Sequence, residues 1–167
     1  MFYPFILIPL LTISLSAKEP ILAILKNINS NDLQQFTLQN YSFYCRPYGI
    51  VTLEDIYRSP IASDTCKKKV IKFYIKNPKS KYFSDTLLKL FQMYHIEFKD
   101  EKCILYANGR KTLSEALVEN GLAVKEPYLK DEIFKYIFDE AQKRASYHKR
   151  GLHADEVLKN CMIYYKK

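Results

Sequence analysis

The sequence predicts an α+β fold, in which antiparallel strands come first and helices and strands then follow one another. Residues 41–45 alternate their side chains in the manner of a half-buried strand. Residues 131–148 repeat apolar side chains at helical spacing, with acidic residues at the start and basic residues near the end. Thr112 and Glu115 have the spacing of a helix-capping box before an apolar run. These three observations define the class.

The first half of the chain predicts a three-stranded meander followed by a helix. Residues 21–28 are apolar and suited to a strand, and residues 35–38 and 41–45 alternate around a turn at residues 39–40. Residues 64–76 then repeat apolar side chains at helical spacing among five lysines. We expect this helix to end before Pro78, because proline cannot continue a helix.

The second half predicts one strand pair and two further helices. Residues 83–92 can continue helically, and residues 93–98 and 103–106 are expected as strands joined by a tight turn. The next helix is expected to start at Thr112 and to end at Gly121, a residue that readily adopts a left-handed C-cap. The helix predicted over residues 131–148 is the last element that we expect in this half of the chain.

The N-terminus has the composition of a targeting segment. Residues 5–15 form an apolar run broken by Pro9, Thr12 and Ser14, and small residues precede the charged Lys18. We interpret residues 1–17 as a cleaved secretory signal, with a retained membrane anchor as the alternative. The rest of the chain shows no linker and no repeat, and 48% apolar content in 167 residues suits one domain.

Export to an oxidising compartment would change the expected chemical state of the four cysteines. All four lie after the signal, and an even number in an oxidising compartment is typical of disulfide bonds. Metal binding is the weaker interpretation, because no Cys-x-x-Cys pair and no Cys/His cluster at ligand spacing occurs. Three connectivities are open for the four residues, which are Cys45, Cys66, Cys103 and Cys161.

Three stretches resemble the staphylococcal nuclease (thermonuclease) family. They are residues 106–123 (YANGRKTLSEALVENGLA), residues 46–54 (RPYGIVTLE) and residues 140–154 (EAQKRASYHKRGLHA). The resemblance runs with gaps over residues 18–154 and implies an OB-type five-stranded β-barrel with three α-helices. Residues 155–167 are then a C-terminal tail. In the resembled fold the strand ending at Cys45 lies beside the one beginning at Cys103, which favours the pairs Cys45–Cys103 and Cys66–Cys161.

The resemblance also implies candidate catalytic residues, and the sequence departs from the family at several of them. The family hydrolyses phosphodiesters with two Ca²⁺-binding aspartates, a glutamate that activates water and two arginines. Arg46 and Glu54 match the first arginine and the glutamate, and Asp32 is a candidate for the first aspartate. Val51 occupies the position of the second aspartate, and a valine cannot ligate calcium. Lys102 is the only nearby substitute for the second arginine, and it lacks the planar fork that grips two phosphate oxygens.

Charge supplies a second functional indication. The chain has 26 Lys and Arg against 18 Asp and Glu, a net charge of +8 that favours anionic partners. The candidate nucleic-acid-binding or partner-binding residues are Lys67, Lys68, Lys69, Lys72 and Lys102. A solvated helix face is the alternative interpretation of the lysine run.

These patterns together predict a periplasmic or secreted nuclease-fold domain that has lost catalysis. We expect it to act as a binding or structural module with an envelope or periplasmic protein partner, without a cofactor and without a membrane span after signal cleavage. The first alternative is a weak or unusual nuclease that uses Arg46, Glu54 and Asp32 with calcium. The second is a basic nucleic-acid-binding protein. An ion pair between Arg46 and Glu54 that ties strand to loop is the non-catalytic interpretation of those two residues.

Overall fold

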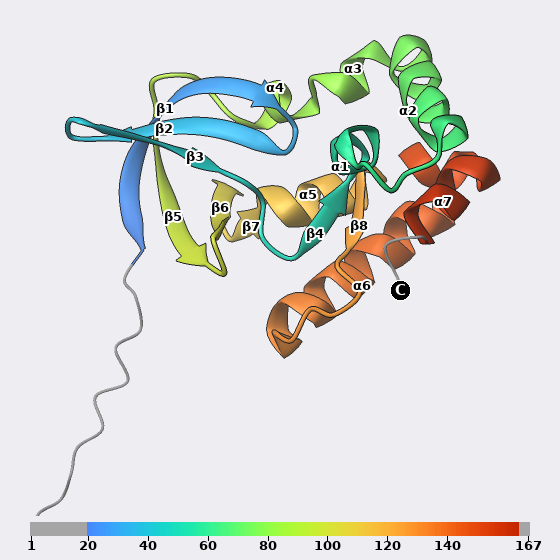
Figure 1. Cartoon of the computed structure of the whole chain (residues 1–167). Helices are drawn as coiled ribbons and strands as arrows, with labels where there is room; N and C mark the ends of the chain where they lie inside the picture. The colour runs from blue at the N-terminus through green and yellow to red at the C-terminus, as the bar shows by residue number, and fades with distance from the viewer. Residues whose placement is uncertain (1–19, 164–167) are drawn as a thin grey trace, which may run out of the picture.

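Two antiparallel sheets form the β part of the protein, whose computed structural model describes residues 20–163 (Figure 1). The larger sheet has the strand order β3-β2-β1-β5-β6-β7, and the smaller one pairs β4 with β8. The strands are β1 (Ile21–Ser30), β2 (Leu33–Leu38), β3 (Tyr41–Cys45), β4 (Ile50–Thr52), β5 (Met93–Lys99), β6 (Lys102–Asn108), β7 (Lys111–Thr112) and β8 (Ala123–Lys125). The α+β class is therefore confirmed.

One helix lies between the two sheets and contacts strands of both, and most of the other helices extend away from the larger sheet (Figure 1). The helices are α1 (Leu53–Arg58), α2 (Asp64–Lys76), α3 (Pro78–Lys81), α4 (Phe83–Leu87), α5 (Leu113–Glu119), α6 (Glu132–Tyr147) and α7 (Glu156–Ile163), with a 3₁₀ helix at Gly151–Ala154. Three of these helices, α2, α5 and α6, were predicted. The helical continuation proposed for residues 83–92 ends at Leu87, because Leu88 is extended and Phe91 has a positive φ of 63°.

The turns explain why consecutive strands pair as they do. The β2–β3 turn places Gln39 at φ 53°, and the β5–β6 turn places Asp100 and Glu101 at φ 47° and 61°. Two successive left-handed residues make the type of tight turn that matches the twist of antiparallel strands. In the β6–β7 turn, Gly109 supplies a single positive φ of 59°.

The larger sheet curves without closing into a continuous barrel among the described residues. An isolated parallel bridge joins Pro47 to Cys103, where the Cys103 amide donates to the Arg46 carbonyl (2.8 Å) and the Tyr48 amide donates to the Cys103 carbonyl (2.9 Å). This bridge links the chain after β3 to β6, which lies on the other side of the sheet order. The structure therefore establishes a curved, mostly antiparallel sheet with one bridge across its opening.

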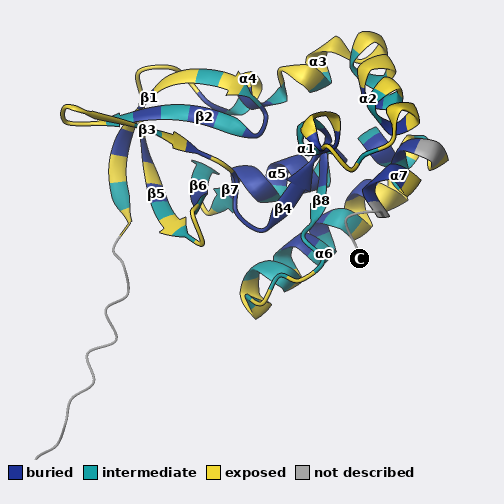
Figure 2. Cartoon of the chain, in the orientation of Figure 1, coloured by how far each residue is buried: buried dark blue, intermediate teal, exposed yellow. Residues whose placement is uncertain are grey.

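Helix α5 lies at the centre of the core (Figure 2). Its Leu113, Leu117 and Val118 are fully buried, and the helix contacts β6, β8 and α6. Thr112 accepts a hydrogen bond from the Glu115 amide (3.1 Å), so the predicted N-cap is confirmed. Burying each large apolar side chain contributes about 1.5–3 kcal/mol, which makes α5 a principal source of stability.

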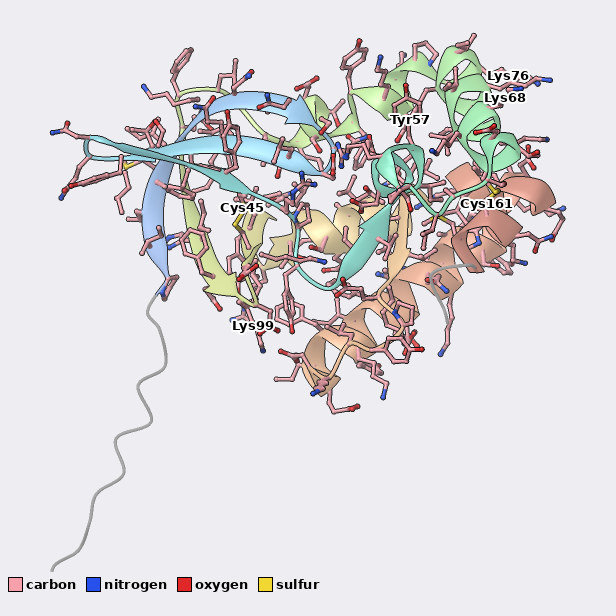
Figure 3. All side chains as sticks on the ribbon, in the orientation of Figure 1. Cys45, Tyr57, Lys68, Lys76, Lys99 and Cys161 are labelled. Carbon is pink, nitrogen blue, oxygen red and sulfur yellow. A yellow bond between two sulfur atoms is a disulfide. The ribbon has the colours of Figure 1, made fainter. Side chains whose placement is uncertain are left out.

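Both predicted cysteine pairs are present as disulfide bonds. Cys45–Cys103 joins the end of β3 to the start of β6, with the Cα atoms 5.4 Å apart, beside the parallel bridge. Cys66–Cys161 joins α2 to α7, with the Cα atoms 5.6 Å apart (Figure 3). Two disulfides are typical of a protein that folds in an oxidising compartment outside the cytoplasm.

The two ends of the sequence differ in what the structure describes. The predicted signal peptide, residues 1–17, lies outside the described residues. The segment after residue 154, expected only as a tail, contains α7, whose Leu158, Cys161 and Met162 are buried in the core. Helix α7 packs against α2, so the core extends beyond residue 154. Within residues 20–163, none of the helices has the length and apolar character needed to cross a membrane.

Candidate functional site

Asp32 is the centre of the residues that the sequence analysis selected. Its side chain is only 3% exposed, and Arg46 Nη1 lies 3.0 Å from its Oδ2. Arg58 Nη2 donates to the same Oδ2, and Ser30 Oγ donates to Oδ1 across 2.6 Å. Both carboxylate oxygens of this buried aspartate are therefore engaged by protein groups.

Local structure explains why these groups meet. Asp32 lies in the short turn between β1 and β2, and Arg46 follows the end of β3. Arg58 is the last residue of α1, whose N-terminus is fixed by a reciprocal capping box between Thr52 and Asp55. Arg58 also pairs with Asp55, one turn earlier on the same helix (3.6 Å). Three segments that are distant in sequence thus converge on one carboxylate.

The geometry does not fit the calcium site that the resemblance implies. Ca²⁺ needs six to eight oxygen ligands, usually with several carboxylates. Val51 is 7% exposed, and its side chain offers no oxygen at the position of the second aspartate. The guanidinium groups of Arg46 and Arg58 are both paired with the Asp32 carboxylate. A cation at Asp32 would have to displace or oppose these two positive charges. No cluster of three or more His, Cys, Asp or Glu side chains suited to a metal occurs in the part of the chain that the structure describes.

Glu54 points into a different environment from Asp32 and Arg46. Its Oε1 accepts a hydrogen bond from Asn31 Nδ2 (3.1 Å), its Oε2 is buried, and the carboxyl also interacts with the neighbouring Tyr74 hydroxyl. Burial raises the pKa of the Glu54 carboxyl, and the neighbouring Tyr74 hydroxyl and Asn31 amide act in the opposite direction. The ion pair of Arg46 is made with Asp32, not with Glu54 as the non-catalytic interpretation expected.

Lys102 lies with Arg46 and not with the other selected lysines. It lines a pocket of about 30 Å³ together with Asp32 and Arg46, and its Nζ lies 2.5 Å from Glu126 Oε1. A more open hollow beside it contains Val51, Arg58 and Lys102. The positive charges around Val51 are thus partly neutralised by acidic neighbours.

The predicted lysine face is on α2 (Figure 3). Lys68 and Lys72 are exposed, whereas Lys67 and Lys69 are half-buried, and Lys69 Nζ lies 3.4 Å from Asp155 Oδ2. A groove of about 440 Å³ runs between α2 and the 3₁₀ helix. Its cationic side chains are Lys69, Lys72, Lys76 and Lys149.

Sequence reasoning missed two residues of this region. Arg58 was not selected, because no helix was predicted over residues 53–58. The Thr52–Asp55 capping spacing was a usable signal for α1, and it would have placed Arg58 in the last turn. Tyr74 was not among the selected residues either. Its position against Glu54 depends on how α2 packs on α1, which the sequence does not show.

No protein-family model matches this chain, and no curated protein sequence matches it. The resemblance to the staphylococcal nuclease family therefore remains an expectation from the motifs, and the function is argued from the site.

Proposed function

We propose that this protein is an exported, non-catalytic binding or structural module with a thermonuclease-like fold. It would work with a protein partner in the periplasm or in an envelope assembly. The proposal has three parts, which concern the loss of catalysis, the fold and the compartment, and each has separate support.

The single observation that carries the loss of catalysis is the pairing of Asp32 with both Arg46 and Arg58. In a thermonuclease-like reaction a metal and two arginines meet the charge that develops on the phosphate. Here Arg46, the candidate for the first of these arginines, is engaged together with Arg58 by the aspartate that would bind the metal, and Glu54 lines a different pocket. Losing one preorganised charged donor typically costs about 10²–10³-fold in rate, and losing the metal costs several kcal/mol more.

Topology supports the finer fold proposal, an OB-type barrel. The meander β1-β2-β3 returns to β6 through the Pro47–Cys103 bridge, and the Cys45–Cys103 disulfide fastens the same place. Helix α5 lies beside the open end of this curved sheet, as a plugging helix would (Figure 1). The bridge is the feature that would complete the ring.

The compartment is supported by the two disulfides and the apolar N-terminal segment. Disulfides of this kind persist in oxidising environments, and a short apolar run followed by small residues is typical of a secretory signal. We therefore place the mature protein in the periplasm or outside the cell, with a retained anchor as the alternative.

A cleavage assay tests the proposal directly. Purified protein is incubated with single- and double-stranded DNA and RNA, with and without millimolar Ca²⁺, and product formation is compared with a buffer blank. We expect no cleavage above the blank. Degradation that disappears in a Glu54→Gln variant would instead establish the weak nuclease. As a partner test, affinity purification from the native envelope should recover a protein at stoichiometric amounts.

A nucleic-acid-binding protein is the second candidate, and the groove beside α2 is the observation that favours it. Four lysines line this groove, and lysine–phosphate contacts give an affinity that falls steeply with salt. Nucleic acid that co-purifies with the protein, and whose binding weakens when Lys72 and Lys76 are changed to glutamine, would select this candidate over the protein-partner module.

A further inference from the structure

A pocket of about 490 Å³ lies between α1, α2 and α3, near the end of β1. Its size falls in the range of pockets that bind small molecules or inserted side chains. It is separate from the small hollow that contains Asp32 and Arg46. Nothing described so far assigns this pocket a role.

The walls of the pocket are mostly aromatic and aliphatic. Tyr57 comes from α1 and Tyr74 from α2, and Tyr82 lines the pocket directly after α3. In Figure 3, Tyr57 lies on the side of α1 that faces α2 and α3. The aliphatic walls are Val70, Ile71 and Ile75. Several of these side chains are unusually exposed for their size, namely Tyr57 (51%), Ile71 (43%), Ile75 (75%) and Tyr82 (58%).

Glu54 and Tyr74 give the lining of the pocket a polar part. Glu54 Oε2 and the Tyr74 hydroxyl are both buried, and the Glu54 carboxyl and the Tyr74 hydroxyl interact with each other, although neither of these two atoms makes a hydrogen bond of ordinary geometry among residues 20–163. Asn31 Nδ2 donates to the other Glu54 oxygen, Oε1, across 3.1 Å. A buried polar group without a well-formed hydrogen bond is energetically costly, and a donor that enters the pocket would relieve that cost.

We propose that this pocket binds an organic cation, an ammonium or guanidinium group carried on an apolar stem. The cation would donate to Glu54 Oε2 while the tyrosine rings surround it, because ring faces attract cations. The stem would lie along Ile71 and Ile75. The cation can be a free amine or the side chain of a lysine or arginine from a partner protein.

The charges around the pocket favour a cation over an anion. Among the described residues, Glu54 is the only acidic side chain that lines it, and burial strengthens its attraction to a positive group. Lys81 is the only basic side chain in the lining, and its Nζ lies 5.6 Å from the centre of the Tyr82 ring. The structure thus already contains one cation resting on an aromatic ring at this pocket. An anion would meet the buried carboxylate of Glu54.

Titration with three probes of equal stem length tests the proposal on the intact mature protein. The probes are hexylammonium, hexanol and hexanoate, and the readout is the methyl NMR signals of Val70, Ile71 and Ile75. We expect hexylammonium to shift these signals and to bind about tenfold or more tightly than hexanol, because charge-assisted hydrogen bonds are the strong ones. Equal binding of all three probes, tighter binding of hexanoate or no binding at millimolar concentration would overturn the proposal.

Matched variants assign the effect to the polar part of the pocket. Glu54→Gln keeps the shape and removes the charge, so the preference for hexylammonium over hexanol should vanish. Tyr74→Phe should weaken hexylammonium binding several-fold. Glu132→Gln removes an exposed carboxylate that pairs with Lys135 on α6 and should change nothing. A preference that persists in Glu54→Gln would contradict the proposal, and thermal melts confirm that each variant is folded.

A further titration, with a peptide, distinguishes the two possible sources of the cation. A short peptide with a central lysine between apolar residues should bind at least tenfold more tightly than hexylammonium if a partner protein supplies the side chain. If hexylammonium binds more tightly than the peptide, a free amine is the ligand. This inference goes beyond the proposed function, and its test measures ligand binding and not cleavage, so failure of one can be told from failure of the other.

Discussion

Arg58 and Arg46 both donate to one oxygen of Asp32, although they lie on α1 and after β3 respectively. The aspartate is almost fully buried, whereas the two arginines are 41% and 47% exposed. The carboxylate therefore loses its water and receives two charge-assisted hydrogen bonds in return. This arrangement ties the β1–β2 turn to the chain around β4, and it turns a candidate metal ligand into a structural link.

Replacing Asp32 by asparagine should destabilise the protein by about 2–3 kcal/mol, because it removes hydrogen bonds to charged groups from a buried site. Urea denaturation measures the change in the free energy of unfolding. Asp139→Asn is the matched control, since Asp139 pairs with Lys125 but is 41% exposed, and exposed pairs contribute about 0–1 kcal/mol. Equal losses in the two variants would show that Asp32 is not a structural link.

Calcium at millimolar concentration should leave the melting temperature unchanged. A ligand stabilises a protein only if it binds the native state, and the two arginines at Asp32 oppose a cation there. Differential scanning calorimetry with Ca²⁺ and with a chelator makes the comparison. An increase of several degrees that is lost in Asp32→Ala would mean that the site binds calcium after all.

Glu54→Gln should be more stable than the unaltered protein at neutral pH and lose this advantage in acid. Burial raises the Glu54 pKa above its usual 4.5, so the native state holds the proton more tightly than the unfolded chain. The native state is then favoured below pH 4.5 and loses stability as the pH rises from there through the raised pKa. Denaturation curves between pH 4 and pH 8 measure the difference. A constant difference across this range would contradict the raised pKa.

The protein should show no reactive thiol until it is reduced, and each disulfide should contribute about 2–4 kcal/mol. The loops that the bridges close span 58 and 95 residues, long enough for a large effect on the unfolded chain. Thiol labelling before and after reduction, followed by mass spectrometry, checks the first point. Changing Cys66 and Cys161 to serine should also make α7 sensitive to limited proteolysis, while the Cys45 and Cys103 pair of changes should not. Four thiols reactive in the native protein would refute both pairs.

Gly151→Ala should cost about 3 kcal/mol or more. A Cβ there would lie 2.2 Å from the carbonyl oxygen of Gly121, where the Leu152 amide already donates across 2.9 Å. The residue also has a φ of 52°, which strains any residue with a side chain. Gly109→Ala is the control, because its φ is 59° but no atom lies within 4 Å, so only about 1–2 kcal/mol should be lost. Equal costs would mean that the backbone contact can relax.

The sequence by itself determined the elements whose signals are local. Strands β1, β2, β3, β5 and β6 and helices α2, α5 and α6 follow from alternation, helical spacing and caps, which depend on residues close together in the chain. The short helix α1 was missed although its capping box is also local. Helix α7 was missed because its burial depends on α2, which provides both the packing surface and the disulfide partner.

Only the tertiary structure decided what the candidate residues do. Sequence offsets placed Arg46 and Glu54 in one motif, yet the fold turns Arg46 toward Asp32 and Glu54 toward Tyr74 and Asn31. The physical reason is that a side chain's charge partner is set by which elements pack together. Arg58 is 26 residues from Asp32, and Tyr74 is twenty residues from Glu54. No local pattern specifies such distant contacts, whereas the packing of α1 between the β1–β2 turn and α2 does.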